Sequence, residues 1–232
     1  GASSAFGTFN GGISAGIGIE SGIMLSTGNV IDAIGPNSSD SKTTNHGTAG
    51  DSDLTAIAGN TTFDAATLTF DFISDGGNIF FDYVFASEEY NEFVNGTVND
   101  SFAFFLDGSN IALIPGTNTP VSINTVNGGN PVGTSASNSE YFNNNDITDG
   151  GPFFDIEYDG FTNVFQASFL GLSAGNHTIS LKIADAGDSS YDSTVFIQAS
   201  SFTDGVSSIP EPSTLAIFSL ALLGLRIRQG KK

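Results

Sequence analysis

A two-residue alternation of apolar and polar side chains constrains the fold of this chain more than any other feature. Apolar residues occupy every second position in two successive runs, namely Leu68, Phe70, Phe72 and then Ile79, Phe81, Tyr83, Phe85. This period is typical of strands with one buried face, because successive side chains point to opposite faces of a sheet. Asp75, Gly76 and Gly77 lie between the runs and favour a turn. We therefore expect a hairpin here.

Similar short apolar segments recur along the chain. They predict strands at 22–26, 101–106, 111–114, 121–124, 152–158, 162–170, 177–184 and 193–201. Only Glu88–Val94 is typical of a helical turn. Many short strands separated by Gly, Asn and Asp indicate an all-β fold, a β-sandwich of jelly-roll type. The 21 phenylalanines supply an ample core, and we expect one short hydrophobic helix at the C-terminus.

The charge balance restricts the partners of the chain. It carries 25 acidic and 6 basic residues, a formal net charge of −19, and Lys42 and Lys182 are the only Lys or Arg before Arg226. This excludes nucleic acid as a partner, because phosphate binding needs a basic face, and it favours multivalent cations. Cysteine is absent and there are two histidines, so disulfides are impossible and zinc or iron would find few ligands.

Two acidic blocks are candidates for a calcium site. The candidate ligands are Glu88, Glu89, Asp100, Asp185, Asp188 and Asp192. The three aspartates of 185–192 lie in a Gly- and Ser-containing loop, and calcium takes six to eight oxygen ligands in irregular geometry. The two adjacent glutamates repel each other unless a cation or distance relieves them. The alternative is that these acids cap turns and face solvent, and the residues alone leave both open.

Catalysis is not expected. Glu88 and Glu89 would point to opposite faces of a strand, which opposes a glycosidase pair. His46 lies in a polar loop, and His177 lies at the start of a strand. No segment has the pattern of a nucleophile elbow. We therefore predict no catalytic residue and no cofactor other than calcium.

The C-terminal segment differs sharply from the acidic body. Residues 203–214 form a polar linker that contains Pro210, Glu211 and Pro212. An apolar run at 215–225 follows, and then a basic terminus. Eleven helical residues extend about 16 Å, well short of the ~30 Å hydrocarbon core of a bilayer. From the residues alone, a membrane anchor and a helix packed on the body both stay open.

The order Pro-Glu-Pro, apolar, basic resembles the PEP-CTERM sorting signal of Gram-negative bacteria. The resemblance implies that an exosortase reads the tail and that the chain is exported to the cell surface. It also implies an association with exopolysaccharide or biofilm matrix, and membrane contact only through the tail.

The body carries a second resemblance. The blocks that carry it are GIMLSTGN at 22–29, GPN at 35–37, YVFASEEY at 83–90, NDSFAFFLDG at 99–108, NIALIPG at 110–116, PVSIN at 120–124 and IADAGDSSYDS at 183–193. Together they resemble the choice-of-anchor L domain of bacterial surface proteins. The resemblance implies surface display and implies no enzymatic activity.

These observations predict three parts: a sandwich at 1–202, a linker at 203–214 and a sorting tail at 215–232. We expect a non-enzymatic protein of the Gram-negative cell surface or extracellular matrix, with an adhesion or biofilm role and calcium in its acidic loops. Two alternatives are a self-assembling fibre subunit, in which one copy donates a strand to the next, and a lectin-like glycan-binding module.

Overall fold

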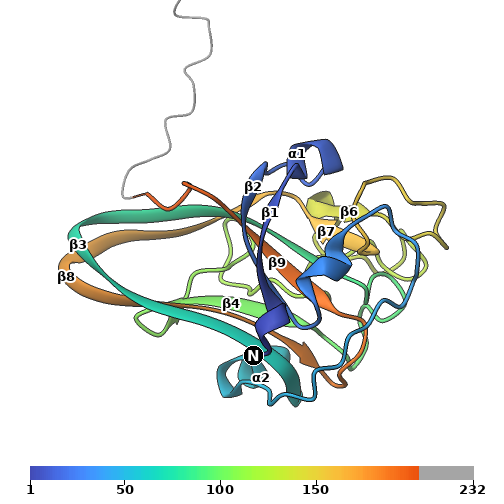
Figure 1. Cartoon of the computed structure of the whole chain (residues 1–232), viewed down its shortest axis with the longest axis horizontal. Helices are drawn as coiled ribbons and strands as arrows, with labels where there is room; N and C mark the ends of the chain where they lie inside the picture. Colours follow the sequence, from blue (N-terminus) through green and yellow to red (C-terminus); the bar gives the residue numbers. More distant parts are fainter. Residues whose placement is uncertain (204–232) are drawn as a thin grey trace, which may run out of the picture.

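One pair of very long strands organises the fold of residues 1–203, the part of the chain that the computed structural model describes. β3 (Thr62–Ser87) and β8 (Phe165–Ala186) run antiparallel, and they pair from Thr62 opposite Ala186 to Tyr83 opposite Phe165. Figure 1 shows the two strands turning together at one end of the molecule. Each strand therefore contributes one half to each of two facing layers.

The bend of β3 lies at Asp75-Gly76-Gly77, where we expected a hairpin turn, and that expectation is wrong because the two halves of β3 pair with β8 and not with each other. Gly76 and Gly77 have φ of +95° and +120°, and the register with β8 shifts between Gly77 and Asn78. An irregularity of this kind bends a strand without ending its pairing. For the same reason the two strands expected at 162–170 and 177–184 are one strand, β8.

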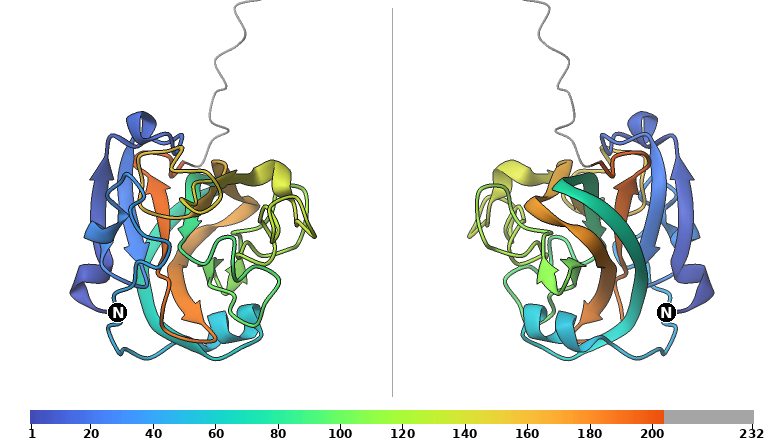
Figure 2. Two further views of the ribbon diagram at one scale, coloured as in Figure 1. Left: turned by 90° about the vertical axis from the view of Figure 1, so that its right-hand side faces the viewer. Right: turned by 90° about the vertical axis from the view of Figure 1, so that its left-hand side faces the viewer.

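A single folded sheet forms the sandwich. Its strand order is β1-β2-β9-β3-β8-β4-β5. The bounds are β1 Phe6–Asn10, β2 Ser21–Ser26, β4 Ser101–Leu106, β5 Ser109–Asn110 and β9 Ser193–Gln198. β1, β2 and β9 extend the later half of β3, whereas β4 and β5 extend the later half of β8, so the two layers face each other (Figure 2). The expected all-β sandwich is confirmed.

Smaller elements close the ends of the layers. They are α1 Gly12–Ala15, α2 Ser52–Ala58, β6 Phe142–Asn144, β7 Gly160–Thr162 and the 3₁₀ turns η1 Ser3–Ala5, η2 Val30–Ala33 and η3 Ser139–Tyr141. α2 was not expected; the Asp51 carboxylate caps it by accepting from the Asp53 and Leu54 amides at 2.9 and 3.2 Å. Such a cap satisfies amides that the first helical turn leaves free.

Several expected segments are irregular instead. The segments 111–114, 121–124 and 152–158 form isolated bridges and turns, and Glu88–Val94 forms hydrogen-bonded turns without a helix. Polar and turn-forming residues flank these segments, so each β-pairing extends over only one or two residues. The hydrophobic helix expected at the C-terminus lies outside the described residues.

Aromatic rings fill the space between the layers. Tyr83 of β3 packs edge-on against Phe102 and Phe104 of β4, with ring centroids 5.3 and 5.0 Å apart. Phe81 packs against Phe104 at 5.0 Å, and Phe85 stacks on Phe102 at 5.0 Å. All five side chains are buried. The alternating face predicted for residues 79–85 is therefore the inner face of one layer.

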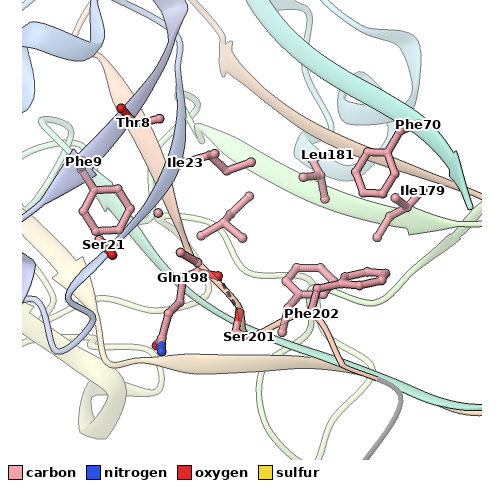
Figure 3. A pocket seen from close by; sticks show the side chains of 14 residues that line it. Thr8, Phe9, Ser21, Ile23, Phe70, Ile179, Leu181, Gln198, Ser201 and Phe202 are labelled. Atoms are coloured by element: carbon pink, nitrogen blue, oxygen red, sulfur yellow. Dashed lines mark hydrogen bonds between the residues drawn. The ribbon is translucent and has the colours of Figure 1, made fainter.

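The layers separate near the end of the described chain. An apolar cavity of about 430 Å³ opens there between β1, β2 and β9 on one side and side chains of β3 and of the later half of β8 on the other (Figure 3). Phe202 forms one wall, with its ring 5.5 Å from that of Phe72 and 6.0 Å from that of Phe81. Thr203 then pairs with Phe80 through two backbone hydrogen bonds of 3.0 and 3.1 Å. The last described residues thus belong to the sandwich.

Candidate functional site

The bend of β3 and β8 brings four strand ends together. Ser87, the last residue of β3, pairs with Ser193, the first residue of β9. Ser101, the first residue of β4, pairs with Ala184 near the end of β8. Acidic residues lie at these strand ends, Asp185 within β8, one residue before its end, and the others just beyond their strands, so Glu88, Glu89, Asp100, Asp185 and Asp192 meet at one end of the sandwich.

Glu89, Asp100 and Asp185 form what we call the Asp185 cluster. Asp100 is held on both oxygens: Oδ1 accepts from the Ala186 amide at 2.8 Å, and Oδ2 accepts from Ser193 Oγ at 2.7 Å. The Glu89 carboxylate accepts from the Asp100 amide at 3.2 Å. Asp185 is 1 % exposed, and neither of its carboxylate oxygens has a hydrogen-bond partner.

The ionised, negatively charged form of the carboxyl groups is unfavourable in the Asp185 cluster. Burial, followed by the neighbouring Asp100, raises the pKa of Asp185 and of Glu89 well above the ordinary carboxyl range. Removing a carboxylate from water costs several kcal/mol unless an opposite charge or hydrogen bonds compensate. The cluster must therefore be neutralised by protons or by a bound cation.

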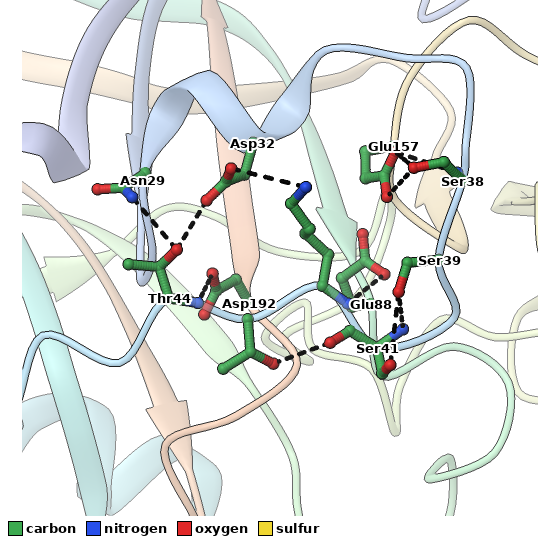
Figure 4. A network of polar contacts seen from close by, with 11 residues as sticks. Asn29, Asp32, Ser38, Ser39, Ser41, Thr44, Glu88, Glu157 and Asp192 are labelled. Carbon is green, nitrogen blue, oxygen red and sulfur yellow. Dashed lines mark hydrogen bonds and ion pairs between the residues drawn. The ribbon is translucent and has the colours of Figure 1, made fainter.

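Glu88 and Asp192 form a second group beneath the loop 38–44 (Figure 4). The Lys42 amide donates to Glu88 Oε2 at 3.3 Å, and the Thr44 amide donates to Asp192 Oδ2 at 2.7 Å. The other oxygen of each carboxylate is buried without a partner. Burial, followed by the charge of Asp159, raises the pKa of Glu88 to about 10, and burial raises that of Asp192 to about 7.

The ammonium group of Lys42 does not relieve this charge. Its Nζ lies 3.9 Å from Asp32 Oδ1. Gly28 makes room for the buried aspartate, since a Cβ at this position would overlap Asp192 Oδ2. The glycine in the GIMLSTGN block thus allows the Asp192 carboxylate to lie directly against the backbone.

Asp188 differs from the other sequence-predicted ligands. It is exposed, and its Oδ1 accepts from the Ser190 amide at 2.9 Å, which is a turn-capping arrangement. Within residues 1–203, no three acidic or histidine side chains are grouped so that they would hold a metal ion by themselves. A calcium ion would therefore need amide, hydroxyl, backbone or water oxygens in addition to carboxylates, as it commonly does.

With this geometry in place, comparison with known proteins decides the family. A family model described as the choice-of-anchor L domain matches residues 1–203, the whole of the described fold. The chain belongs to the choice-of-anchor L family. A second model, the PEP-CTERM protein-sorting motif, matches residues 208–232 and includes Pro210, Glu211 and Pro212. Searches of curated proteins and of solved structures returned no match.

Both resemblances inferred from the sequence are thus confirmed. This choice-of-anchor L protein is an exported surface protein, and its sorting motif implies processing by an exosortase in a Gram-negative type of cell envelope. No helix within residues 1–203 combines the length and apolar character needed to cross a membrane.

The choice-of-anchor L domain also buries acids that sequence reasoning missed, namely Asp64, Asp146, Glu157 and Asp159. Two of them have evident structural roles. Asp64 accepts from the His46 and Thr48 amides, and Glu157 accepts from the amide and hydroxyl of Ser38. Asp159 has a hydrogen bond on one oxygen only. Asp64 stands apart from other acids in the sequence, whereas Asp146 lies three residues before Asp149, and Asp155, Glu157 and Asp159 alternate along the chain, a local clustering that could have indicated them.

His177 is held in a structural arrangement. Its Nδ1 lies 2.6 Å from Asp107 Oδ2, and its Nε2 lies 2.9 Å from the Ser173 carbonyl. The hydrogen bond to Asp107 raises the pKa of His177. With both ring nitrogens engaged, this histidine presents no free nitrogen to activate a nearby hydroxyl.

Proposed function

We propose that this protein is a calcium-stabilised, non-enzymatic module of the cell surface that serves adhesion or the biofilm matrix. The observation that carries the calcium proposal is Asp185, which is buried with two unpartnered carboxylate oxygens beside Asp100 and Glu89. The display of the module follows from its family and its sorting motif.

The charge balance of the described chain supports a bound cation. Nine acidic residues are buried: Asp64, Glu88, Glu89, Asp100, Asp146, Glu157, Asp159, Asp185 and Asp192. The two lysines of residues 1–203 are paired elsewhere, Lys182 with Asp51 and Asp53 and Lys42 with Asp32. A buried carboxyl whose pKa is raised only to about 7, such as that of Asp192, begins to lose its proton near neutral pH. A divalent cation neutralises the same carboxylates at that pH.

Calcium is the divalent cation that fits these residues best. The donors are carboxylate oxygens, together with the hydroxyl of Ser193, which is bonded to Asp100, and the buried, unpartnered hydroxyl of Ser101, the next residue in the chain. Calcium accepts such a mixed shell at about 2.3–2.6 Å with irregular geometry, whereas magnesium demands a tighter octahedron. The absence of cysteine removes the softer donors that transition metals prefer.

We expect calcium to raise the melting temperature of the protein and EDTA to lower it. A site at a hundred times its dissociation constant adds about 2.7 kcal/mol to the free energy of unfolding. For a chain of this size, each kcal/mol shifts the midpoint by roughly 2–4 °C. Thermal unfolding followed by circular dichroism in excess calcium, in excess magnesium and in EDTA measures this. Identical melting curves in calcium and EDTA would remove the basis of the proposal.

The surface role predicts a processed C-terminus. We expect protein recovered from the cell surface of the native host to lack the basic end of the tail, because an exosortase would cleave after reading Pro210-Glu211-Pro212. Intact-mass analysis measures this, with a host lacking the exosortase as the control. Mature surface protein that retains Lys232 would contradict processing and would leave a plain anchor.

A further inference from the structure

We propose that the apolar cavity beside Phe202 holds the chain's own apolar segment, residues 215–225, before an exosortase processes the protein. In this state the domain covers a segment that would otherwise expose apolar side chains to water. The role is separate from the proposed calcium binding, since none of the described residues that line the cavity is acidic.

The cavity has the size and the lining of a binding site for apolar groups. Its volume of about 430 Å³ lies within the range of about 300–1,000 Å³ that is usual for ligand pockets. Figure 3 shows Ile23 of β2 on one side of the cavity and Phe70 and Ile179 on the other. Further apolar side chains line it, namely Phe9, Phe81, Leu181, Ile197 and Phe202.

The described residues leave two aromatic rings at the cavity partly uncovered. Phe70 is 39 % exposed and Phe202 is 45 % exposed, and their ring centroids lie 6.3 Å apart. Removing apolar surface from water is favourable, and exposed apolar surface beside a cavity often marks a binding site. The cavity and these two rings therefore favour an apolar occupant.

The place where the described chain ends favours the adjoining segment as that occupant. Phe202 lines the cavity, and Thr203 is held to Phe80 by two backbone hydrogen bonds. Eleven residues, 204–214, separate Thr203 from Leu215. At about 3.3–3.6 Å per residue they span at most roughly 40 Å, so residues 215–225 can reach the cavity. A short tether gives an effective concentration of about millimolar, with which any free ligand must compete.

The chemistry of the segment matches the lining of the cavity. Its sequence is LAIFSLALLGL, in which Ser219 has the only polar side chain. As a helix, eleven residues extend about 16 Å, which is well short of the ~30 Å hydrocarbon core of a bilayer. A bilayer would therefore not cover the segment as a complete span, whereas the cavity buries several of its side chains at once.

Charge favours the same occupant. Acidic residues adjoin the lining residues in the sequence: Glu20 precedes Ser21, Asp71 follows Phe70 and Asp82 follows Phe81. The apolar segment is followed directly by the basic end of the chain, namely Arg226, Arg228, Lys231 and Lys232. Opposite charges attract the basic end to the acidic domain. An apolar molecule without a cationic end lacks this contribution.

A single tryptophan tests the docking in the full chain, which has none of its own. Phe218→Trp places the reporter in the segment, and its emission is blue-shifted when the ring is shielded from water. We expect blue-shifted emission, and a red shift when Ala199→Asp is added, because Ala199 is an exposed residue of the cavity wall and a carboxylate there opposes apolar contacts. Ala136→Asp adds the same charge at an exposed position outside the cavity and is expected to leave the emission unchanged.

Disulfide formation provides a second readout. The chain has no cysteine, so Ala199→Cys and Leu222→Cys in one chain form a single possible intramolecular pair. We expect them to join at least tenfold faster than the control pair, Ala136→Cys with Leu222→Cys. Circular dichroism checks that each variant keeps the β fold. Equal rates for the two pairs, or tryptophan emission that Ala199→Asp leaves unchanged, would overturn the proposal.

Other occupants of the cavity give different results. The segment of a second copy would make the disulfide intermolecular and the emission dependent on protein concentration. A co-purified apolar molecule would add mass in native mass spectrometry while the tryptophan emits as in water. Either result would overturn docking within one chain. Repeating the measurements in calcium and in EDTA separates this proposal from the calcium proposal, because the docking is expected in both.

Discussion

Replacing Phe104 with alanine is expected to lower the free energy of unfolding by about 3–5 kcal/mol. Phe104 is fully buried on β4, and its ring lies 5.0 Å from both Phe81 and Tyr83 of the opposite layer. It also contacts Phe102 on its own strand at 5.2 Å. Removing the ring leaves a cavity between two layers that β3 and β8 hold at a fixed distance, so the site cannot easily collapse.

Denaturant unfolding in excess calcium measures this loss without interference from metal binding. Phe153→Ala is the matched control, because Phe153 is 59 % exposed and its removal is expected to change stability by less than about 0.5 kcal/mol. Equal effects of the two substitutions would contradict the packing of β3 against β4 that defines the sandwich.

In the absence of calcium, stability is expected to fall as the pH rises from about 4 to 8. Burial raises the pKa of Asp192 to about 7, of Asp159 to about 8 and of Glu88 to about 10. The unfolded chain releases these protons near pH 4. Between the two pKa values the folded state holds more protons than the unfolded state, so deprotonation favours unfolding. For Asp192 alone, a rise from 3.8 to about 7 corresponds to about 4 kcal/mol.

Denaturant unfolding at several pH values, with EDTA and with calcium, measures this dependence. Calcium is expected to flatten the curve above pH 6, because the ion replaces the protons. Glu88→Gln removes one of the shifted carboxyls and is expected to reduce the slope in EDTA. A calcium-free protein that becomes more stable from pH 4 to pH 8 would show that the buried carboxylates are already paired.

The sequence predicted the alternating face of β3 correctly but missed the path of the strand. Ile79, Phe81 and Tyr83 are buried as expected, since a period of two depends only on local geometry. The glycines at 76 and 77 are equally typical of a hairpin turn and of a bend in a continuous strand. Only the partner β8, about a hundred residues further along the chain, decides between them.

The acidic residues likewise include some whose role the sequence predicted and some that it missed. The two predicted blocks prove to be neighbours because the ends of β3 and β8 meet, which no local pattern could establish. Asp159 follows Asp155 and Glu157 in an alternating acidic run, but its hydrogen-bond partner Asn37 comes from a distant segment. Which acids are buried becomes visible only once tertiary structure shows what surrounds them.

The position of β9 determines how the domain would respond to mechanical force. β9 pairs with β2 on one side and with β3 on the other, and the described chain ends a few residues beyond it. Tension applied through the residues after Thr203 would first load the two hydrogen bonds between Thr203 and Phe80 of β3, and only then β9. Because β9 is hydrogen-bonded to a neighbour on each side, its removal from the sheet would break both ladders.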